Sequence, residues 1–522
     1  MPLLQAYNIS YQLDNGDFLF QQLSCSLSNK RIGLVGRNGV GKSILASILS
    51  GEQQPSSGAV ALPQSVAVYH QQPPPLLSCE LTIAQFLGID QVLKAIKQVE
   101  SGDCSQQWFD IIKEQWELPL KLTQQLQEQG LPTDVDFPCA QLSGGQFARL
   151  KLWQLFASNV ELLILDEPSN HLDVQAKHWL IQSMRAFKGA ILLVSHERKL
   201  LHEMDEIWQL SELGLQVFGG NYTLYAEQKR AELQALERKL ASVDKQRKQL
   251  QVQTQKNREK AEQRAAQGNQ LRKNGSQPKV LLDAKKDKAT AQAANRIKNE
   301  QLRRAHLHNT ERSLKAHKES FKGQKLYLAH TPTRSRKVIS MRQGVLPFGR
   351  TEPISFQAYA HDKIYLAGKN GSGKSTLLKT LLGDVSLQRG ELQINTPLYY
   401  LDQHFGVIRG DLSLLDNLVT LCSGLKESDA RTLLAGVGFS RDNVFRLGHM
   451  LSGGEKMKLA MLIVSHQAAH PFLLLDEPDN HLDLESKLML AQAFNQYPGG
   501  FILVSHDEDF VRESGVQMRI DI

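Results

Sequence analysis

The sequence predicts an α/β fold in which two similar domains are joined by a long helical linker. Two observations carry this prediction. The loop Gly36–Ser43 has the pattern G-x-x-x-x-G-K-[ST], and the same pattern returns at Gly368–Thr376. Between them, a stretch rich in Ala, Gln, Lys, Arg and Leu has a composition typical of helices. We therefore expect a first domain at residues 1–222, a linker at 223–328 and a second domain at 329–522.

Each loop is predicted to bind the phosphates of a nucleotide. Its glycines leave backbone N–H groups free to contact phosphate oxygens, and its lysine reaches the terminal phosphates. The apolar runs Arg31–Val35 and Lys363–Ala367 precede the loops, and helix-forming residues follow, so the strand, loop and helix context is present. The loop residues are Gly36, Arg37, Asn38, Gly39, Val40, Gly41, Lys42 and Ser43, and in the second copy Gly368, Lys369, Asn370, Gly371, Ser372, Gly373, Lys374, Ser375 and Thr376.

Length and composition restrict the class of protein. A chain of 522 residues with 41% hydrophobic residues is long enough for about three domains with large cores. Apolar stretches such as Ala190–Val194 are strand-sized, shorter than the roughly 18 residues of a membrane-spanning helix, and the first residues lack a secretory signal pattern. We therefore expect a cytoplasmic protein without a membrane segment. The scattered cysteines argue against a zinc site, an iron–sulfur cluster or a disulfide framework: Cys25, Cys79, Cys104, Cys139 and Cys422.

The positive charge is concentrated in the predicted linker. The whole chain carries a net charge of +7, but residues 221–330 alone contain 26 Lys and Arg against 11 Asp and Glu, a net charge of +15. The remainder of the chain is therefore acidic, with a net charge of −8. Charge asymmetry of this kind indicates a polyanionic partner, usually a nucleic acid.

Two further motifs follow each phosphate loop. Leu-Ser-Gly-Gly occurs at Leu142–Gln146 and at Leu451–Glu455, and apolar runs then end in Asp-Glu-Pro at Pro168 and Pro478. A buried strand that ends in two carboxylates suits metal-assisted phosphoryl transfer, because one carboxylate can bind Mg²⁺ and the next can polarise the attacking water.

Later in each domain, Asn-His-Leu-Asp ends at Asp173 and Asp483, and Val-Ser-His ends at His196 and His506. The latter motif places a histidine after a predicted strand, where ligand sites of parallel sheets lie. A single histidine is more often a satisfied core or surface group, but its return in the same context favours a functional role.

Taken in this order, the motifs resemble those of the ATP-binding cassette superfamily, and the resemblance covers both halves of the chain. It implies an ATPase that uses ATP and Mg²⁺. The roles it implies are phosphate binding by Lys42 and Lys374, Mg²⁺ binding by Ser43, Ser375, Asp166 and Asp476, water activation by Glu167 and Glu477, and contact with the γ-phosphate by His196 and His506.

The same resemblance implies further nucleotide contacts. The glutamine of the superfamily matches Gln403 and Gln72, for which Gln71 is the competing choice, and Tyr11 either stacks on adenine or packs on its own strand. Cassettes of this superfamily close head to tail, so one chain would close on two ATP molecules as a monomer. Ser143, Gly144 and Gly145 would then cap the nucleotide on the second phosphate loop, and Ser452, Gly453 and Gly454 the nucleotide on the first.

The spacing of the repeated motifs locates an insertion. The phosphate loops start 332 residues apart and the candidate glutamines lie 331 apart, whereas the Asp-Glu and His motifs lie 310 apart. About 22 extra residues in the first domain must therefore lie between Gln72 and Leu142. The stretch around 90–130, which carries Trp108 and Trp116, is predicted to be either a small docking protrusion or a longer helical subdomain.

The linker is predicted to form two long helices with a tip at Gly268–Pro278. In the first helix, apolar residues at 3–4 spacing form a coiled-coil seam that Arg247 interrupts. The second helix offers Ile297, Leu302 and Leu314 as contacts. About 40 helical residues would extend roughly 60 Å. The seam residues of the first helix are Leu233, Leu236, Leu240, Val243 and Leu250.

Basic residues gather near the predicted tip. Each of them alone fits a solvated surface charge, but together they favour binding to a phosphate backbone through counterion release. Aromatic residues are nearly absent there, which favours folded RNA or duplex over a single strand. The predicted RNA-binding residues are Arg264, Arg272, Lys273, Lys279, Lys285, Lys286 and Lys288.

Tandem cassettes, the basic helical linker and the run Gly219–Tyr225 that leads into it together resemble the ABC-F family. The resemblance implies a ribosome-associated ATPase whose linker contacts ribosomal RNA and peptidyl-tRNA. Regulation of translation, rescue of stalled ribosomes and protection from antibiotics all fit the pattern. The alternatives are an ATPase subunit of a membrane transporter, which has little use for such a linker, and a DNA-repair or chromosome-maintenance ATPase.

Overall fold

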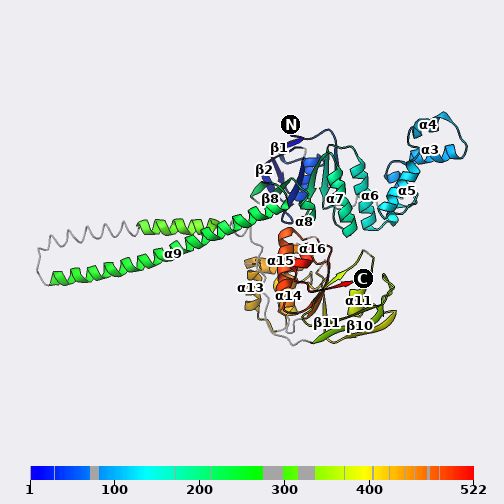
Figure 1. Cartoon of the computed structure of the whole chain (residues 1–522). Coiled ribbons are helices and arrows are strands. Elements are labelled where there is room, and N and C mark those ends of the chain that lie inside the picture. Colours follow the sequence, from blue (N-terminus) through cyan, green and yellow to red (C-terminus); the bar gives the residue numbers. More distant parts are fainter. Residues whose placement is uncertain are drawn as a thin grey trace. The chain divides into compact units, whose positions relative to one another are not determined.

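In the computed structural model, the chain forms two compact units: Met1–Thr223 with Gln324–Ile522, and Leu224–Gly323. The first unit holds both phosphate-loop domains and the second holds most of the helical linker (Figure 1). The domain boundaries expected at 222 and 328 stay a prediction. The structure describes residues 2–28, 30–70, 81–170, 172–211, 213–273, 298–314, 336–369, 371–401, 405–422, 424–439, 441–451, 453–466, 471–480 and 482–522.

The first domain is built on a six-stranded sheet. Its strands are parallel except for the last pair, β8 and β9, which is antiparallel. Every residue of the two strands at positions two and three of the sheet is buried, as expected for apolar runs covered on both faces. The order is β5 (Val66–Tyr69), β6 (Leu162–Asp166), β7 (Ala190–Val194), β3 (Arg31–Gly36), β8 (Glu206–Ser211) and β9 (Gly214–Gly219).

The second domain repeats this sheet with five strands, all parallel. Because the strand order matches that of the first domain, each phosphate loop follows a central strand in both copies. The order is β14 (Leu398–Leu401), β15 (Phe472–Asp476), β16 (Phe501–Val504), β12 (Lys363–Ala367) and β17 (Met518–Asp521). The strands predicted before both phosphate loops are thereby confirmed.

A small antiparallel sheet accompanies each parallel sheet. Its inward residues join one core with the first helix after the phosphate loop, α1 (Lys42–Ser50) or α11 (Lys374–Leu382). The strands are β2 (Phe18–Leu27), β1 (Leu4–Gln12) and β4 (Ser57–Ala61) in the first domain, and β11 (Ile354–Tyr359), β10 (Lys337–Val345) and β13 (Arg389–Ile394) in the second.

The remaining helices carry the other motifs. In the first domain they are α6 (Gly144–Ala157), α7 (Val174–Ala186) and α8 (Arg198–Leu201). In the second they are α14 (Gly453–Ser465), α15 (Leu484–Gln496) and α16 (Glu508–Glu513). Asp173 and Asp483 cap α7 and α15 by accepting a backbone N–H three residues later, which explains why Asn-His-Leu-Asp is followed by a helix.

The stretch predicted to hold the insertion is helical. It contains α3 (Asp90–Glu100), α4 (Gln106–Ile112) and α5 (Leu118–Glu128), which enclose a small core of Ala95, Ile96 and Ile112. It lies between α2 (Ile83–Phe86) and η2 (Cys139–Gln141). The corresponding part of the second domain holds α12 (Leu414–Leu421), α13 (Glu427–Gly436), η3 (Arg441–Phe445) and η4 (Gly448–Met450). A docking role for the insertion stays a prediction.

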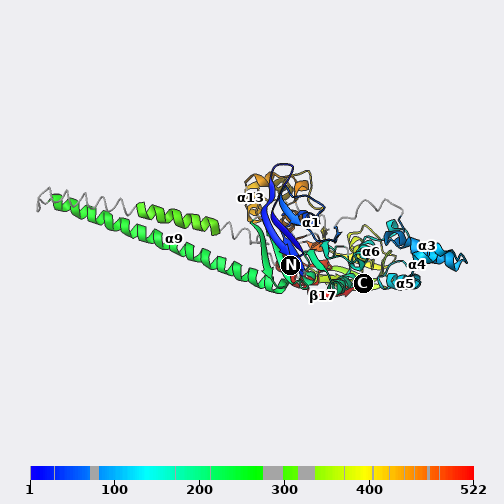
Figure 2. The ribbon, with the colours of Figure 1, turned by 90° about the horizontal axis from the view of Figure 1, so that it is seen from above.

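The linker forms the predicted helical hairpin. Helix α9 (Tyr222–Lys273) runs 52 residues, past Gly268, and a second helical segment spans residues 298–314 (Figure 1 and Figure 2). Thr254 bonds Glu300, and Arg247 pairs with Glu311 at 3.1 Å, so the residue that interrupts the apolar seam has an ionic partner on the returning helix. Among the described helices, none combines the length and the apolar character that crossing a membrane requires.

The seam is only partly as predicted. Leu236 and Val243 are buried, and the other three leucines of the predicted seam, Leu233, Leu240 and Leu250, are half-buried. Leu302, predicted as a contact, is 61% exposed, and the half-buried leucines of the returning helix are Leu307 and Leu314. A seven-residue step keeps two side chains on one helix face, whereas Leu302 lies five residues from Leu307 and faces elsewhere.

Replacement of Leu490 by alanine is expected to destabilise the second domain by about 2–5 kcal/mol, because the side chain is fully buried in its core and the change leaves a cavity. Urea unfolding followed by circular dichroism measures the change, because all five tryptophans lie in the first domain and do not report on the second. Leu120→Ala is the matched control, since Leu120 is 75% exposed on a helix. Equal midpoints for the two variants would contradict the packing described.

Candidate nucleotide-binding sites

Parallel strand pairing brings the sequence motifs of each domain to one sheet edge. Asp166, the last residue of β6, lies opposite Val194 at the end of β7, and Asp476 lies opposite Val504 in the same way. The next residue continues the pattern, since the N–H of Glu167 donates to the Val194 carbonyl at 2.9 Å. The carboxylates and the histidine loops of both domains therefore meet beside the phosphate loops.

The first phosphate loop is shaped to receive an anion. Helix α1 begins at Lys42 after Gly41, whose φ of 94° is favourable only for glycine and where an added Cβ would lie 2.4 Å from a Leu19 methyl group. No side chain caps this helix start, so its first N–H groups remain available to phosphate oxygens. The Lys42 ammonium donates to the carbonyl oxygens of Gly36 and Arg37 at 2.9 and 3.0 Å, which holds it within the loop.

The second loop repeats this geometry. Lys374 donates to the carbonyls of Gly368 and Lys369 at 2.8 and 2.9 Å, and Gly373 precedes α11 with a φ of 104°. Burial lowers the pKa of both lysines, although the neighbouring carboxylates oppose the shift. Two lysines in the same environment indicate that both loops are built for the same ligand.

A hydroxyl and a carboxylate lie together behind each loop. Ser43 bonds the Asp166 carboxylate, and Ser375 bonds Asp476, which also accepts a hydrogen bond from the Tyr400 hydroxyl at 3.1 Å. Burial raises the pKa of both carboxyl groups, and Oδ1 of Asp166 is buried without a hydrogen-bond partner. Oxygen ligands of this kind suit Mg²⁺, which takes its other ligands from phosphate and water. The residues therefore fit the predicted Mg²⁺–ATP.

A glutamate and a histidine face each other at each site. Glu167 lies 3.5 Å from Nε2 of His196, and Glu477 lies 3.2 Å from Nε2 of His506. Both glutamates have a left-handed backbone, with φ of 48° and 50°, a conformation that costs energy for any residue but glycine. The same strain at both sites indicates that the backbone is held so that the carboxylate reaches a required position.

The electrostatic surroundings of the two sites differ. Burial raises the pKa of Glu167 to about 8 and, together with Lys42 and Lys487, holds the pKa of His196 well below its ordinary value. In the second domain, the hydrogen bond from His506 lowers the pKa of Glu477 despite burial. The Glu477 side chain is 31% exposed, against 13% for Glu167, so water stabilises the charge of Glu477 better.

The first Leu-Ser-Gly-Gly motif starts α6 with a capping box. The N–H of Gln146 donates to the Ser143 hydroxyl at 3.3 Å, and the Gln146 side chain accepts from the Ser143 N–H at 3.0 Å. A Cβ on Gly144 would meet no atom within 4 Å, so this end of the helix is open. In the second motif, Gly453 and Gly454 begin α14, while Ser452 lies outside the described residues.

A cavity of about 870 Å³ connects these elements. It is lined by the first phosphate loop, by Glu167 and His196, and also by Glu477 and His506 of the second domain. Ser143–Gly145 line the same cavity, which places the first motif beside the catalytic residues predicted for the other domain. The second phosphate loop is not among the described lining residues, so the head-to-tail arrangement and capping of a nucleotide by Ser143–Gly145 stay predictions.

Polar contacts join the two domains around the cavity. The N–H of Asn38 in the first phosphate loop donates to Asp483 at 3.1 Å, and Arg37 pairs with Glu485 at 2.9 Å. Behind the histidine loops, Arg198 forms two bonds of 2.6 and 2.7 Å with Glu513. The first phosphate loop is thus tied to the capping residue of α15 in the second domain.

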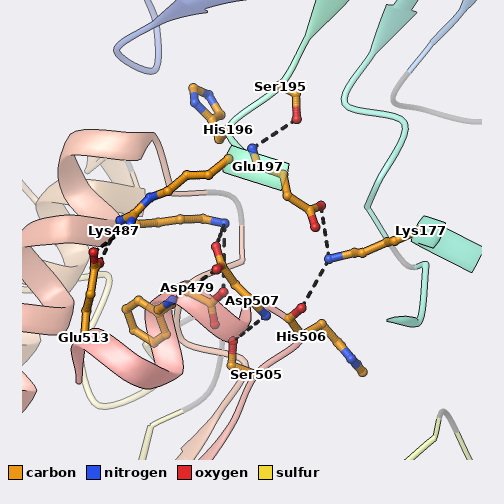
Figure 3. A network of polar contacts seen from close by, with 12 residues as sticks. Lys177, Ser195, His196, Glu197, Asp479, Lys487, Ser505, His506, Asp507 and Glu513 are labelled. Carbon is orange, nitrogen blue, oxygen red and sulfur yellow. Dashed lines mark hydrogen bonds and ion pairs between the residues drawn. The ribbon is translucent and has the colours of Figure 1, made fainter. Parts of the chain in front are cut away.

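A buried network of charged groups, missed by the sequence predictions, lies between the histidine loops (Figure 3). Lys177 lies 3.1 Å from Glu197 and donates to the carbonyl of His506 at 3.5 Å. Lys487 lies 3.1 Å from Asp507 and 3.9 Å from Asp479. The sequence held a signal for these residues, because Lys177 and Lys487, and the acids that follow the two histidines, recur at the same spacing of 310 residues as the catalytic motifs.

Some predicted site residues remain outside these observations. The Tyr11 hydroxyl accepts a hydrogen bond from Nε2 of Gln53 at 2.6 Å, and its ring packs against Phe20 and the first-domain core, so its contact with adenine stays a prediction. Val40 also packs on that core. Gln72, Gln403, Asn370, Lys279, Lys285, Lys286 and Lys288 lie outside the described residues. Arg264 is exposed on α9, and Arg272 and Lys273 end that helix.

Comparison with known proteins agrees with this geometry. Residues 20–170 and 351–480 match the family described as ABC transporter. YdiF of Bacillus subtilis is 29% identical over 98% of this chain and 78% of its own length. The ATP-binding protein Uup of Escherichia coli is 28% identical over 92% of this chain and 74% of its own length. ABC transporter F family member 5 of Arabidopsis thaliana is 27% identical over 93% of this chain and 70% of its own length.

Among solved structures, the archaeal ribosome recycling factor aABCE1, in complex with the ribosomal stalk protein aP1, matches with a TM-score of 0.53. The match covers 98% of this chain and 87% of that chain at 16% identity. At this identity the likeness shows the fold alone.

The charged network is expected to make stability sensitive to acid. Burial alone would raise the pKa of Asp507, but Lys487 and the N–H of Phe510 outweigh it and hold that pKa below the ordinary value. Such a carboxylate stabilises the fold above its unfolded pKa of about 4, and this contribution is lost as the pH falls. Asp507→Asn should therefore reduce the slope of unfolding free energy against pH between about pH 5 and 3.

Urea unfolding at half-unit pH steps measures this slope. Asp136→Asn serves as the control, since Asp136 forms a surface ion pair in which both side chains are 65% exposed. A slope for Asp507→Asn equal to that of the unmodified protein would show that the Asp507 carboxylate is not stabilised by folding.

Proposed function

We infer the function of this chain from one established premise: the chain belongs to the ABC-F family, in which two ATP-binding cassettes occur in tandem. We propose that it is an ATP-hydrolysing, ribosome-binding translation factor of the cytoplasm. In this proposal, ATP closes the two domains, and closure places the basic hairpin near peptidyl-tRNA. The observation that carries the proposal is a long helical hairpin: residues 221–330 carry a net charge of +15, while the two ATP-binding domains together carry −8.

ATP hydrolysis is supported by the groups at the sheet edges. Lys42 and Lys374 would hold the phosphates, and Ser43 with Asp166 and Ser375 with Asp476 would hold Mg²⁺. When bound, Mg²⁺ neutralises charge on the phosphates as the γ-phosphoryl group is transferred. Glu167 and Glu477 would polarise the attacking water, and His196 and His506 would contact the γ-phosphate. Burial of His196 and partial burial of Glu167 and His506 support the proposal, because a low dielectric strengthens their electrostatic effect, whereas Glu477 is 31% exposed.

Closure within one chain is supported by the contacts between the domains. The first phosphate loop touches Asp483, and the two histidine loops are joined through Lys177, while Arg198 and Glu513 form a two-bond ion pair behind them. These contacts involve different residues on the two sides, which favours pairing of the first domain with the second domain of one chain. We therefore propose a monomer that closes intramolecularly on two ATP molecules.

The hairpin is proposed to bind ribosomal RNA. Near the far end of the described part of α9, Lys256, Lys260 and Arg264 are exposed, and Arg258 pairs with Glu262 on the same helix. Exposed cations that support no packing are available to neutralise phosphates, and release of counterions then supplies binding energy. ATP acts in this mechanism by binding one conformation better than the other, and hydrolysis sets the time spent on the ribosome.

The double variant Glu167→Gln with Glu477→Gln tests the proposal. It keeps the shape of both sites but removes the groups that activate water, so the protein should stay closed on ATP. We expect it to pellet with bacterial ribosomes through sucrose in ATP and to remain in the supernatant in ADP. The control is the same protein carrying Lys42→Ala and Lys374→Ala, which should bind neither ATP nor ribosomes.

Binding of ATP without any binding to ribosomes would contradict the proposal. It would favour one of the two alternatives, an ATPase subunit of a membrane transporter or a DNA-repair or chromosome-maintenance ATPase. Pull-down experiments with membranes and with duplex DNA would distinguish between them. The state of the ribosome in the trapped complex would then distinguish between regulation of translation, rescue of stalled ribosomes and protection of ribosomes from antibiotics.

Neutralisation of the predicted tip should weaken ribosome binding. Replacement of Lys285, Lys286 and Lys288 by alanine is expected to reduce the slope of log affinity against log salt by about 1 for each lysine that contacts a phosphate. Nucleotide affinity should not change. The matched control replaces Lys188, Lys379 and Lys426, three exposed lysines of the ATP-binding domains outside the insertion. Equal ribosome binding by both triple variants, measured from 50 to 200 mM salt, would refute the role of the tip.

A further inference from the structure

Lys177 connects the histidine loops of the two domains. It lies on α7 of the first domain, and its side chain is only 13% exposed. Its ammonium is anchored by Glu197, the residue after the first histidine, at 3.1 Å. It also donates to the backbone carbonyl of His506 at 3.5 Å (Figure 3). One cation thus contacts the peptide of His506 from the opposite domain.

The repeat-related lysine behaves differently. Lys487 occupies the same place on α15, but it is held by two carboxylates of its own domain, Asp507 at 3.1 Å and Asp479 at 3.9 Å. The first domain has Ser169 where the second has Asp479. Lys177 therefore has one carboxylate partner in its own domain, whereas Lys487 has two. The two lysines thus differ by one carboxylate partner in their own domains, although the charge of Lys487 also acts across the interface on Glu197 and His196.

We propose that Lys177 is a positioning residue for the ATPase site of the second domain: anchored on Glu197, it fixes the peptide of His506 and thereby the histidine ring beside Glu477. This inference rests on the proposed ATPase function. The ring of His506 lies 3.2 Å from the Glu477 carboxylate, so a change in its backbone moves a group in direct contact with the predicted water-activating residue. Displacements of about 1 Å at such groups can lower a rate by roughly two orders of magnitude.

The contact depends on closure of the domains. Arg198 and Glu513, whose side chains are 11% and 31% exposed, hold α8 of the first domain against α16 of the second. Both helices begin two residues after their histidines. When this pair separates, Lys177 loses the carbonyl of His506 but keeps Glu197. The second site is therefore complete only while the domains are closed, which makes hydrolysis there conditional on closure.

Turnover at the second site can be measured alone in a Glu167→Gln background. There, Lys177→Met is expected to lower kcat about tenfold with KM changed less than about twofold, because the loss affects positioning of the histidine rather than binding of the phosphates. Lys177→Arg should recover most of the rate, since the guanidinium can still donate to the carbonyl. The matched control is Lys199→Met, which removes an ion pair between the domains. The side chains of Lys199 and its partner Glu508 are 37% and 58% exposed, so this change should alter kcat less than about twofold.

A second variant tests the asymmetry without removing the lysine. Ser169→Asp provides Lys177 with the carboxylate that Lys487 already has. It should draw the ammonium away from His506 and lower kcat at the second site in the same direction. If Lys177→Met fails to fold because Glu197 is left unpaired, the double variant Lys177→Met with Glu197→Gln is measured instead, since it removes both charges.

A second readout does not need ATP. In protein with ¹³C-labelled histidine, the ring signal of His506 is identified by its loss in His506→Gln. We expect this signal to shift in Lys177→Met and Ser169→Asp and to stay in place in Lys199→Met. An unmoved signal, or an unchanged kcat in Lys177→Met, would overturn the proposal.

The two readouts keep this inference separate from the proposed function. If the Glu167→Gln parent does not hydrolyse ATP, the ATPase proposal fails for the second site. The His506 signal then still decides whether Lys177 positions the histidine loop.

Discussion

Parallel pairing of buried strands places the reactive groups of both domains. The register that sets Asp166 opposite Val194 also brings the N–H of Glu167 to the Val194 carbonyl, and the second domain repeats this at Asp476 and Val504. A slip of one residue would turn the carboxylates to the other face of the sheet. Apart from the terminal Asp166, the residues of β6 and β7 are apolar, and all of them are buried, so the hydrophobic effect enforces the register that the chemistry needs. The strained backbone of both glutamates is held by this framework.

Pairing of the two domains with each other is set by charge differences between repeat-related residues. Glu203 and Glu513 lie at equivalent positions, but Glu203 pairs with Arg185 inside its own domain. The second domain has Asn495 in place of that arginine, so Glu513 is available to Arg198 across the interface. Because the same acid has different partners in the two copies, the interface favours one first domain against one second domain.

Burial of charge at this interface has an energetic cost that its contacts only partly offset. Removing a carboxylate or an ammonium from water costs several kcal/mol, and even well-paired buried ions are weak evidence for stability. Lys177, Lys487 and their acids are all less than about a seventh exposed, and their placement beside the histidine loops is better explained by orientation than by stability. The surroundings of Glu167 and Glu477 are also unequal, although their sequence motifs are nearly identical: burial dominates at Glu167 and the hydrogen bond from His506 at Glu477.

The sequence by itself determined the local chemistry: two phosphate loops, the strands before them, the carboxylates and histidines after later strands, and a basic helical hairpin. These features depend on spacing within a few residues, on strand-sized apolar runs and on composition, all of which are local. The spacing of 310 also held the signal for Lys177 and Lys487, but their partners could not be assigned from it. Only the tertiary structure decided which acid pairs with which base. Ser169 and Asn495 stand where the other domain has a charged residue, so each leaves one charge of its own domain with fewer local partners. The partner that such a charge takes instead lies in a distant segment and is identified only when the segments meet in the fold.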